Sequence, residues 1–319
     1  MQRRSLGLML TLPFAAQAQP AWTPDKPIRL LVGFAPGGST DTTARVVAQA
    51  ITAGLGQSVL VENRTGAAGN LANEHVARSA PDGYSLVMGS IGTHATNQAL
   101  YRNLSFHVVR DFAPVSLVAL SACLLVVRAN LPVQSTAELI ARAKAQPGSL
   151  NCGIAGAGSS QHFAAALFEH QAGIRFTQVA YRGGAPAMAD LVSGRLDVMF
   201  TPVVEAIEQV RAGQVRALGI TRQARSPQLP DIPAVAEAMP GYAFNSWLGV
   251  FAPAGTPAPI VLRLSREIAA GLATPAVKAR MEQLGYEVVG STPEEFAAFQ
   301  AAELPRVTEL VRISGATVE

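Results

Sequence analysis

The stretch Ile28–Asp41, with the sequence IRLLVGFAPGGSTD, contains the pattern that the rest of the chain repeats. It opens with an apolar run of strand length, Ile28–Phe34, and then turns at Pro36-Gly37-Gly38. After Thr40, apolar residues recur at the i, i+3, i+4 and i+7 spacing of one helix face, and these residues are Ala44, Val47, Ala48 and Ile51. A strand that leads through a glycine-rich turn into a helix is the building unit of a parallel sheet.

The same succession of strands and helices continues and then restarts in the middle of the chain. Further strands are predicted at 58–61, 84–88, 121–127, 150–154, 176–181, 196–200, 215–220 and 243–251. Helices are predicted at 136–145 and 161–171, up to residues 78, 193 and 212, and at 260–272, 275–284 and 293–313, the last interrupted at Pro305. Such alternation favours sheets covered by helices on both faces.

The number of strands indicates two sheets and therefore an α/β protein with two lobes. We predict that each lobe is a mainly parallel sheet flanked by helices. Because the helical tail has only one or two strands, we expect it to return to the first sheet. Lobe 1 then comprises residues 22–121 and 246–319, and lobe 2 comprises residues 122–245. The chain would cross between them at Leu120–Cys123 and Asn245–Gly249, which is the hinge geometry of a ligand clamp.

Residues 1–18 have the features of an export signal. Two positive residues, Arg3 and Arg4, precede a short apolar run that ends in Ala16-Gln17-Ala18, the pattern of a secretory cleavage site. The apolar run has about half of the roughly 20 residues that a membrane-spanning helix needs. We therefore predict a cleaved N-terminal signal peptide.

Composition excludes two classes of protein. With 319 residues, 49% of them hydrophobic, the chain can bury a large core, which excludes a disordered protein. Without residues 1–18, the 25 basic and 22 acidic side chains become 23 and 22, a net charge of +1. No block of like charges remains, so we expect no nucleic-acid partner. Cys123 and Cys152 could form a disulfide or remain two buried thiols, and their number alone does not distinguish these outcomes.

Three glycine-rich loops share one position, because each joins the carboxyl end of a predicted strand to a helix. Their sequences are PGGSTD at 36–41, GAGSSQH at 156–162 and YRGG at 181–184. A helix N-terminus offers free N–H groups and a partial positive charge, and glycine lets a ligand approach the backbone closely. Ligands of open parallel sheets collect at this edge. Loops from both lobes could therefore surround a small carboxylate.

The candidate ligand-binding residues come from these loops and from the segment after strand 84–88. They are Gly37, Gly38, Ser39, Thr40, Asp41, Thr93, Asn97, Gly158, Ser159, Ser160, His162, Arg182, Gly183 and Gly184. The alternative is that glycine and serine only form tight turns and caps. Ser39 and Asp41 suit a helix cap, and a carboxylate at Asp41 would compete with a bound anion. His162 could be structural, Arg182 a solvated turn residue, and Trp247 a core residue instead of a cleft wall.

The common catalytic patterns are not present. Gly156-Ala157-Gly158 starts a dinucleotide fingerprint, but Gln161 stands where the third glycine is required. No serine lies in a Gly-x-Ser-x-Gly motif. The five histidines have no i, i+4 pair and no cysteine at zinc spacing. We therefore expect neither an enzyme nor a bound metal or cofactor.

Blocks of sequence in a fixed order resemble a known family. They are Phe34–Asp41, Glu62–Asn70, Tyr181–Pro186, and Ser246–Gly249 followed by Pro253–Pro257. Together they resemble the Bug family, the periplasmic solute-binding receptors of tripartite tricarboxylate transporters, from about residue 22 to the C-terminus. The resemblance implies a two-lobed, type II-like periplasmic binding protein that holds a small carboxylate between its lobes through backbone amides and ordered waters.

The resemblance also implies the roles of the loops and the partners. Gly37–Asp41 and Gly158–His162 would be paired carboxylate clamps, and Arg182–Gly184 would close from the second lobe. The sequence departs from the family pattern at Cys152-Gly153, where a small or aromatic strand residue is expected. We expect a monomer that passes its ligand to the membrane components of the transporter. The alternative is a sensor of the same fold that signals to a membrane kinase.

Overall fold

The computed structural model describes residues 22–317, so the predicted signal peptide at 1–18 lies outside the described residues. The strands are β1 Ile28–Val32, β2 Val59–Asn63, β3 Ser85–Ser90, β4 Phe112–Arg128, β5 Asn151–Ile154, β6 Thr177–Ala180, β7 Val198–Pro202, β8 Val215–Ile220, β9 Asn245–Pro253 and β10 Tyr286–Val288. Two short helical turns, η1 Ala67–Gly69 and η2 Gly92–Thr96, follow β2 and β3. The α-helices are α1 Ser39–Leu55, α2 Asn70–Ala77, α3 Asn97–Leu100, α4 Thr136–Ala145, α5 Ser160–Ala172, α6 Gly184–Val192, α7 Val203–Arg211, α8 Val235–Ala238, α9 Ala258–Ala273, α10 Pro275–Gln283 and α11 Pro293–Ser314.

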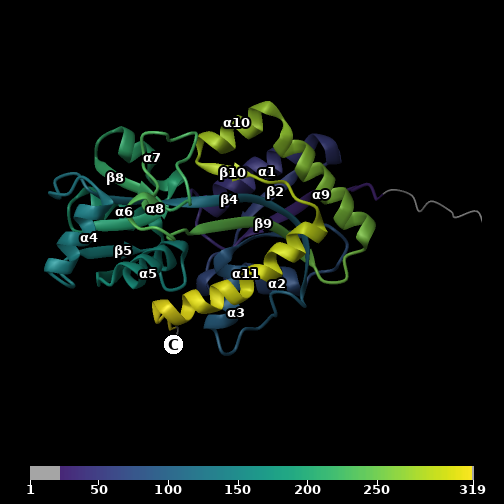
Figure 1. The fold of residues 1–319 in the computed structure, drawn as a ribbon. Coiled ribbons are helices and arrows are strands. Elements are labelled where there is room, and N and C mark those ends of the chain that lie inside the picture. The colour runs from purple at the N-terminus through teal and green to yellow at the C-terminus, as the bar shows by residue number, and fades with distance from the viewer. Residues whose placement is uncertain (1–21, 318–319) are drawn as a thin grey trace, which may run out of the picture.

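Strand β4, 17 residues long, connects two groups of strands (Figure 1). The sheet has the order β2-β1-β3-β9-β4-β7-β5-β6, and β8 and β10 also pair with β4. The first group contains β1, β2, β3, β9 and β10 with the N-terminal part of β4, and the second contains β5 to β8 with its C-terminal part. β4 pairs with β9 as far as Ala122 and with β7, on its other side, from Cys123 onward.

Each strand group has a parallel part and an antiparallel part. β2, β1 and β3 run parallel to one another, as do β6, β5 and β7. By contrast, β4 runs antiparallel to β9 and to β7, and β9 runs antiparallel to β3. The carboxyl ends of the parallel strands are followed by the three glycine-rich loops, which the sequence places after β1, β5 and β6.

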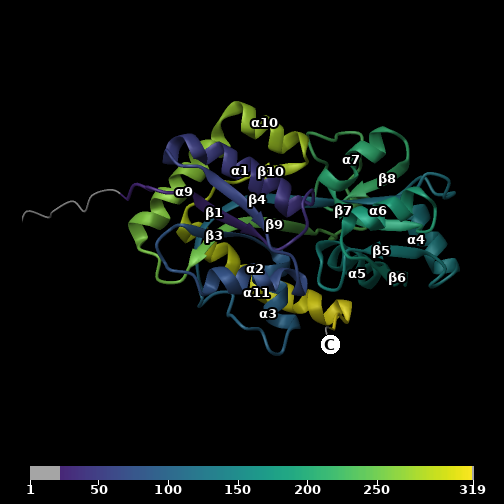
Figure 2. The ribbon, with the colours of Figure 1, turned by 180° about the vertical axis from the view of Figure 1, so that it is seen from behind.

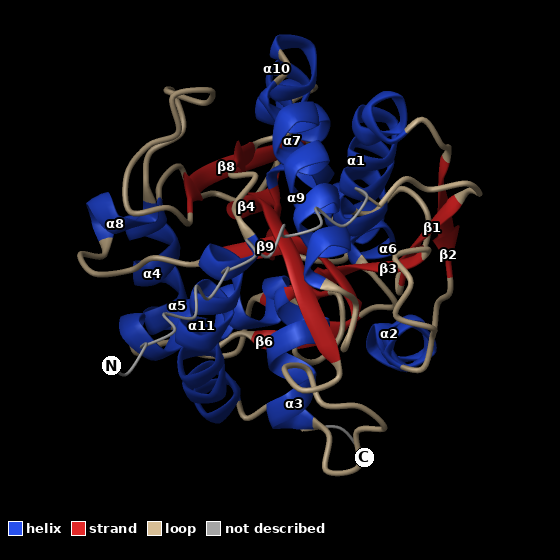
Figure 3. Cartoon of the chain, turned by 90° about the vertical axis from the view of Figure 1, so that its right-hand side faces the viewer, coloured by secondary structure: helices blue, strands red, loops and turns tan. Residues whose placement is uncertain are grey.

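Helices cover both faces of the sheet (Figures 1 and 3), and the apolar cores beneath them differ between the two faces. On the face covered by α2, α5 and α11, one apolar core continues through both strand groups and includes Leu31 of β1 and Leu125 of β4. On the other face the core is divided. α1 and α9 cover Leu30 and its neighbours in the first group, whereas α6 and α7 cover Leu124 and its neighbours in the second. The two groups are therefore joined on one face and separately packed on the other.

The predicted elements agree with the structure in type, and the differences are local. α4 and β8 have the predicted bounds. β4 begins at Phe112 instead of 121, and β10 was not predicted. The predicted interruption at Pro305 is wrong, because α11 runs through it. Proline has no N–H, so Pro305 cannot donate a hydrogen bond to the carbonyl of Ala301, one turn earlier. Both residues are exposed, so water can bind that carbonyl instead.

Several side chains whose role was left open have defined positions. Trp247 is a core residue with no exposed surface, and its Nε1–H donates to Glu303 Oε2 at 3.1 Å. Cys123 and Cys152 are free thiols, both buried.

Within residues 22–317 no helix is both long enough and apolar enough to cross a membrane. The described part of the chain also has no group of three acidic, histidine or cysteine side chains placed to hold a metal ion.

Candidate functional site

The first glycine-rich loop leads from β1 into α1. Gly37 has a positive φ of 87°, a conformation that favours glycine, and Gly38 is the N-cap residue of α1. Because the N-cap residue is glycine, no side chain accepts a hydrogen bond from the first turn of the helix, which begins at Ser39. The prediction that Ser39 or Asp41 caps this helix is therefore wrong. The first N–H groups of α1 are available to acceptors from elsewhere.

Asp41 supports this loop from inside the protein. Its carboxylate accepts the Gly37 N–H at 2.9 Å and is also bound by Arg45 and Asn63. Burial raises the pKa of Asp41, but the hydrogen bonds from Arg45, Gly37 and Asn63 outweigh it and lower the pKa below its usual value. Both carboxylate oxygens are thus used by the protein. We assign Asp41 a positioning role behind the loop.

The second loop leads from β5 into α5, and side chains fix its shape. Ser159 is the N-cap of α5, and its Oγ accepts the His162 N–H at 3.2 Å. The His162 ring is buried, and its Nδ1 accepts the Gly158 N–H at 3.1 Å. Burial lowers the pKa of His162, which keeps the ring neutral at pH 7. His162 therefore binds the loop backbone. Because the Gly158 N–H donates to His162, it is not free to bind a ligand.

Gly158 brings the two strand groups into contact. A Cβ atom at this position would lie 2.7 Å from Thr96 Cγ2 and 3.0 Å from Leu100 Cδ2, which belong to the segment after β3. The φ of Gly158 is +75°, so the backbone conformation also favours glycine. A loop of the second group and the η2–α3 segment of the first group therefore pack directly against each other.

Thr93 and Asn97 lie in this η2–α3 segment, and both are nearly fully buried. Thr93 Oγ1 lies 3.0 Å from His94 Nδ1. Asn97 Nδ2 donates to Asn70 Oδ1 at 2.6 Å and to the Ala68 carbonyl at 3.2 Å. Both side chains bind the protein itself: Asn97 fastens the 66–70 loop, and Thr93 bonds Ser90 and His94 within its own segment.

The third loop leads from β6 into α6 and contains the N-cap residue Gly183. Arg182 is exposed. Gly184, the first residue of α6, lies against Glu205, and a Cβ atom at Gly184 would overlap Glu205 Oε2 and lie 3.2 Å from Gln161 Nε2. This loop therefore meets both the second loop and helix α7.

All three loops converge on Glu205, in the first turn of α7. Its Oε2 accepts hydrogen bonds from Gln161 Nε2 at 3.2 Å and from Thr201 Oγ1 at 3.1 Å. The backbone N–H of Ser39, at the start of α1, lies near this carboxylate and lowers its pKa, although burial raises that pKa more. A carboxylate of the chain itself thus accepts a hydrogen bond from the second loop and lies close to the other two loops.

Sequence reasoning missed Glu205 and Gln161 as candidates. Gln161 lies between the candidate residues Ser160 and His162, and in the sequence it stands out only as the position where a dinucleotide fingerprint would require glycine. Glu205 follows the carboxyl end of β7, which runs parallel to β5 at the same edge of the sheet as the second and third loops. An acidic residue in the first turn after such a strand is the signal that could have found it.

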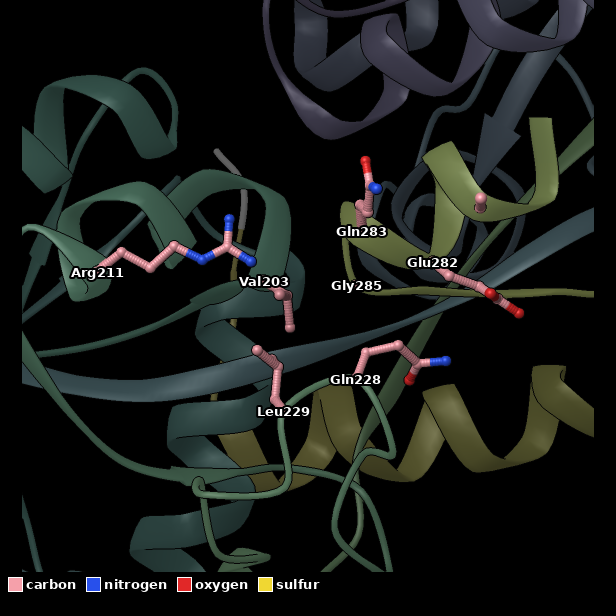
Figure 4. A pocket seen from close by; sticks show the side chains of 8 residues that line it. Val203, Arg211, Gln228, Leu229, Glu282, Gln283 and Gly285 are labelled. Carbon is pink, nitrogen blue, oxygen red and sulfur yellow. The ribbon is translucent and has the colours of Figure 1, made fainter. Parts of the chain in front are cut away.

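Two hollows on the described surface lie outside these loops. One, of about 280 Å³, separates α7 from α10, and Figure 4 shows the side chains that line it, with Arg211 extending from α7 toward the hollow. Its lining includes Val203, two residues before Glu205, and Gly285, next to Tyr286. Tyr286 Oη donates to the Ser39 carbonyl at 3.1 Å, so this hollow borders the point where the loops meet. The other, of about 740 Å³, lies along α2.

Comparison with known proteins places the chain in one family. The model of the tripartite tricarboxylate transporter family receptor, TctC, matches residues 43–315. Protein BugT of Bordetella pertussis is 34% identical over 312 residues, which cover 97% of this chain and 94% of BugT. The structure described as R. palustris Rpa4515 with adipate has a TM-score of 0.88 and 36% identity, covering 92% of this chain and 99% of that one.

A second solved structure is similar and also contains a carboxylic acid. It is MatC (Rpa3494) from Rhodopseudomonas palustris with bound malate, with a TM-score of 0.83 and 34% identity over 90% of this chain and 99% of that one. The resemblance to the Bug family in the sequence is thereby confirmed. The family consists of solute-binding receptors and not of enzymes. The chain belongs to the TctC family of tripartite tricarboxylate transporter receptors.

Proposed function

We propose that this chain is an extracytoplasmic solute-binding protein that captures a small organic carboxylate between two lobes. The observation that carries the proposal is the convergence of the loops before α1, α5 and α6 on one point. Helix N-termini are suited to anions because they combine free N–H groups with a partial positive charge. The acids in the two related structures, adipate and malate, are both dicarboxylates, which supports the same ligand class here.

The proposed lobes comprise residues 22–121 with 246–319, and residues 122–245. Two observations support this division. The pairing of β4 with β9 ends at Ala122 and its pairing with β7 begins at Cys123, inside the proposed crossing segment 120–123. The cores on the α1 and α7 face are separate, whereas the core on the α11 face is shared. Movement between the lobes would therefore open the face on which α1 and α7 lie (Figure 2).

Backbone amides would provide most of the binding. In this proposal Gly38, Ser39 and Thr40 contribute N–H groups from the start of α1, Ser160 from the start of α5, and Gly183 and Gly184 from the start of α6, with Arg182 at the rim. The Ser159 N–H already donates to the Gly156 carbonyl at 3.3 Å. Each charge-assisted hydrogen bond contributes about 1.5–3 kcal/mol. Three or four of them support micromolar affinity after the cost of ordering the ligand.

The location and the partners follow from the same proposal. Export by the signal at residues 1–18 would place the protein in the periplasm. There it would act as a monomer and deliver its ligand to the membrane components of a tripartite tricarboxylate transporter. Neither step requires a metal, a cofactor or a nucleic acid.

A thermal-shift series tests the ligand class. Adipate and malate are the acidic probes, and hexane-1,6-diol is the uncharged control that has the chain length of adipate. A ligand at 100 times its Kd stabilises the folded state by about 2.7 kcal/mol, so the acid that binds should raise the Tm and the diol should not. If the diol raises the Tm and both acids leave it unchanged, the carboxylate proposal is wrong.

A further inference from the structure

Glu205 lies at the centre of the proposed site, and all the hydrogen-bond donors of its carboxylate are uncharged groups. Its two hydrogen-bond donors are a side-chain amide and a hydroxyl, from Gln161 and Thr201, and the backbone N–H of Ser39 lies near it. Among the ion pairs found within residues 22–317, none includes Glu205, whereas its neighbour Glu208 pairs with Arg211. When it is ionised, Glu205 is therefore a partly buried charge that no cationic side chain of the described chain balances by direct contact.

The ionisable groups around Glu205 do not supply that balance. Cys123 of β4 and Tyr286 of β10 both feel its charge, and burial is the main cause that raises the pKa of each, so both are neutral at pH 7. On α5, His162 is buried and neutral. On α1, Asp41 is occupied by Arg45.

Two more groups near the α6 loop complete the surroundings of Glu205. Arg182, before α6, is exposed. Asp190, within α6, is paired with Arg195. Neither provides a charge in direct contact with Glu205.

The position of Glu205 conflicts with a second negative charge. A ligand carboxylate that accepts the Ser39 N–H would lie next to Glu205, and the two carboxylates would compete for the donors Ser39 and Gln161. Two carboxylates at hydrogen-bonding distance cannot both remain ionised, and one of them holds a proton. Burial, which raises the pKa of Glu205 above its usual value, makes this group the one that holds it.

We propose that Glu205 is a ligand-binding residue that takes up one proton from solvent when a carboxylate enters the site and donates its O–H to that carboxylate. This inference rests on the proposed function and adds a residue that selects the ligand. The protonated side chain would hydrogen-bond an acid, and the site would then hold one negative charge instead of two. No bond other than this hydrogen bond forms, and the proton returns to solvent when the ligand leaves.

Proton uptake gives the binding a defined pH dependence. Where Glu205 is ionised before binding, each higher pH unit makes the proton ten times scarcer, so the Kd should rise by up to tenfold per unit. Glu205→Gln has nearly the same shape and carries an N–H donor at any pH. Its Kd should not rise over this range, and at pH 8 it should bind the acid at least as tightly as the unaltered protein does.

Isothermal titration calorimetry with adipate and malate tests the inference. Each acid is titrated at pH 7.5 in phosphate and in Tris, buffers whose ionisation enthalpies differ, so that the difference in heat counts protons taken up. We expect close to one proton per ligand for the unaltered protein, none for Glu205→Gln, and an unchanged count for the matched control Glu208→Gln on the exposed side of α7. Thermal unfolding of both variants verifies that they fold.

Two results would overturn the role of Glu205 and leave the proposed function intact. One is binding of an acid with no proton uptake by the unaltered protein. The other is a loss of affinity in Glu205→Gln, which would mean that the charged form of Glu205 binds the ligand. If neither acid binds to the unaltered protein or to Glu205→Gln, the proposed function itself fails, and the role of Glu205 fails with it.

Discussion

His94 provides a direct test of the packing behind the site, because it is a histidine buried in an apolar layer. Its ring stacks on Phe251 at a centroid distance of 3.9 Å and meets Phe112 edge-on at 4.7 Å. Its Nε2 is buried without a hydrogen-bond partner in the described structure. Desolvation lowers the pKa of His94 to about 3, so the folded protein holds the ring neutral.

Because of this lowered pKa, the free energy of unfolding should fall as the pH falls below about 6.5. In the unfolded chain His94 takes up a proton below its usual pKa of about 6.5, whereas the folded protein does not. The unfolded state therefore gains about 1.4 kcal/mol per pH unit below 6.5. At pH 5, which is about 1.5 units lower, the folded state should lose about 2 kcal/mol through His94 alone.

Urea unfolding at pH 7.5 and pH 5 measures this loss. The unaltered protein is compared with His94→Gln, which cannot titrate in this range, and the loss between the two pH values should be smaller in the variant by about 2 kcal/mol. Any loss of packing in the variant is present at both pH values and cancels in the difference. The reasoning is refuted if both proteins lose the same stability between pH 7.5 and pH 5.

Three further substitutions test the contacts around the loops. Gly158→Ala should destabilise the protein by about 1–3 kcal/mol in urea unfolding, because the new Cβ would lie 2.7 Å from Thr96 Cγ2 and the φ is +75°; an unchanged midpoint would contradict this contact. Trp247→Phe should cost about 1 kcal/mol or more, since it removes the hydrogen bond to Glu303 inside the core, and a variant as stable as the unaltered protein would show that this bond contributes nothing. Asp41→Asn should lower both stability and ligand affinity, because the loop loses a charged acceptor for Gly37 and Arg45; calorimetry that finds the affinity unchanged would remove Asp41 from the support of the site.

Local patterns in the sequence were sufficient to predict most elements. The helix α1 and the strand β8 have clear periodicity and clear ends, and they are found where the pattern indicated. β4 was predicted too short because Pro114 and Ser116 interrupt the apolar run, and pairing with β9 extends the strand across them. β10 has three residues and exists through its pairing with Leu120 and its neighbours, more than 160 residues earlier, which no local pattern contains.

The loops could be predicted, but the distribution of hydrogen bonds among their residues could not. Glycine and hydroxyl residues at the ends of strands mark the positions of helix N-termini, and all three loops lie there. Whether a polar side chain faces a ligand or the protein depends on tertiary partners. Asn97 and Asp41 bind residues that lie 22 to 29 positions away in the sequence, and Glu205 bonds Gln161, which is 44 positions away.

The central claim is that the glycine-rich loop before α1 holds the carboxylate of the ligand. Gly38→Val tests it, because Gly38 has a φ of −75° and a Cβ atom there would meet only the Ala35 carbonyl, at 3.7 Å. The variant should therefore fold, while its side chain covers the N–H groups at the start of α1. Ala53→Val, an exposed position near the other end of the same helix, is the matched control.

The decisive measurement is the Kd of the acid that gives the larger thermal shift, determined by calorimetry for both variants. Loss of one charge-assisted hydrogen bond, about 1.5–3 kcal/mol, weakens binding by roughly 10- to 150-fold. We predict a loss of at least this size for Gly38→Val and an unchanged Kd for Ala53→Val. A folded Gly38→Val protein that binds the acid as tightly as the unaltered protein would contradict the claim.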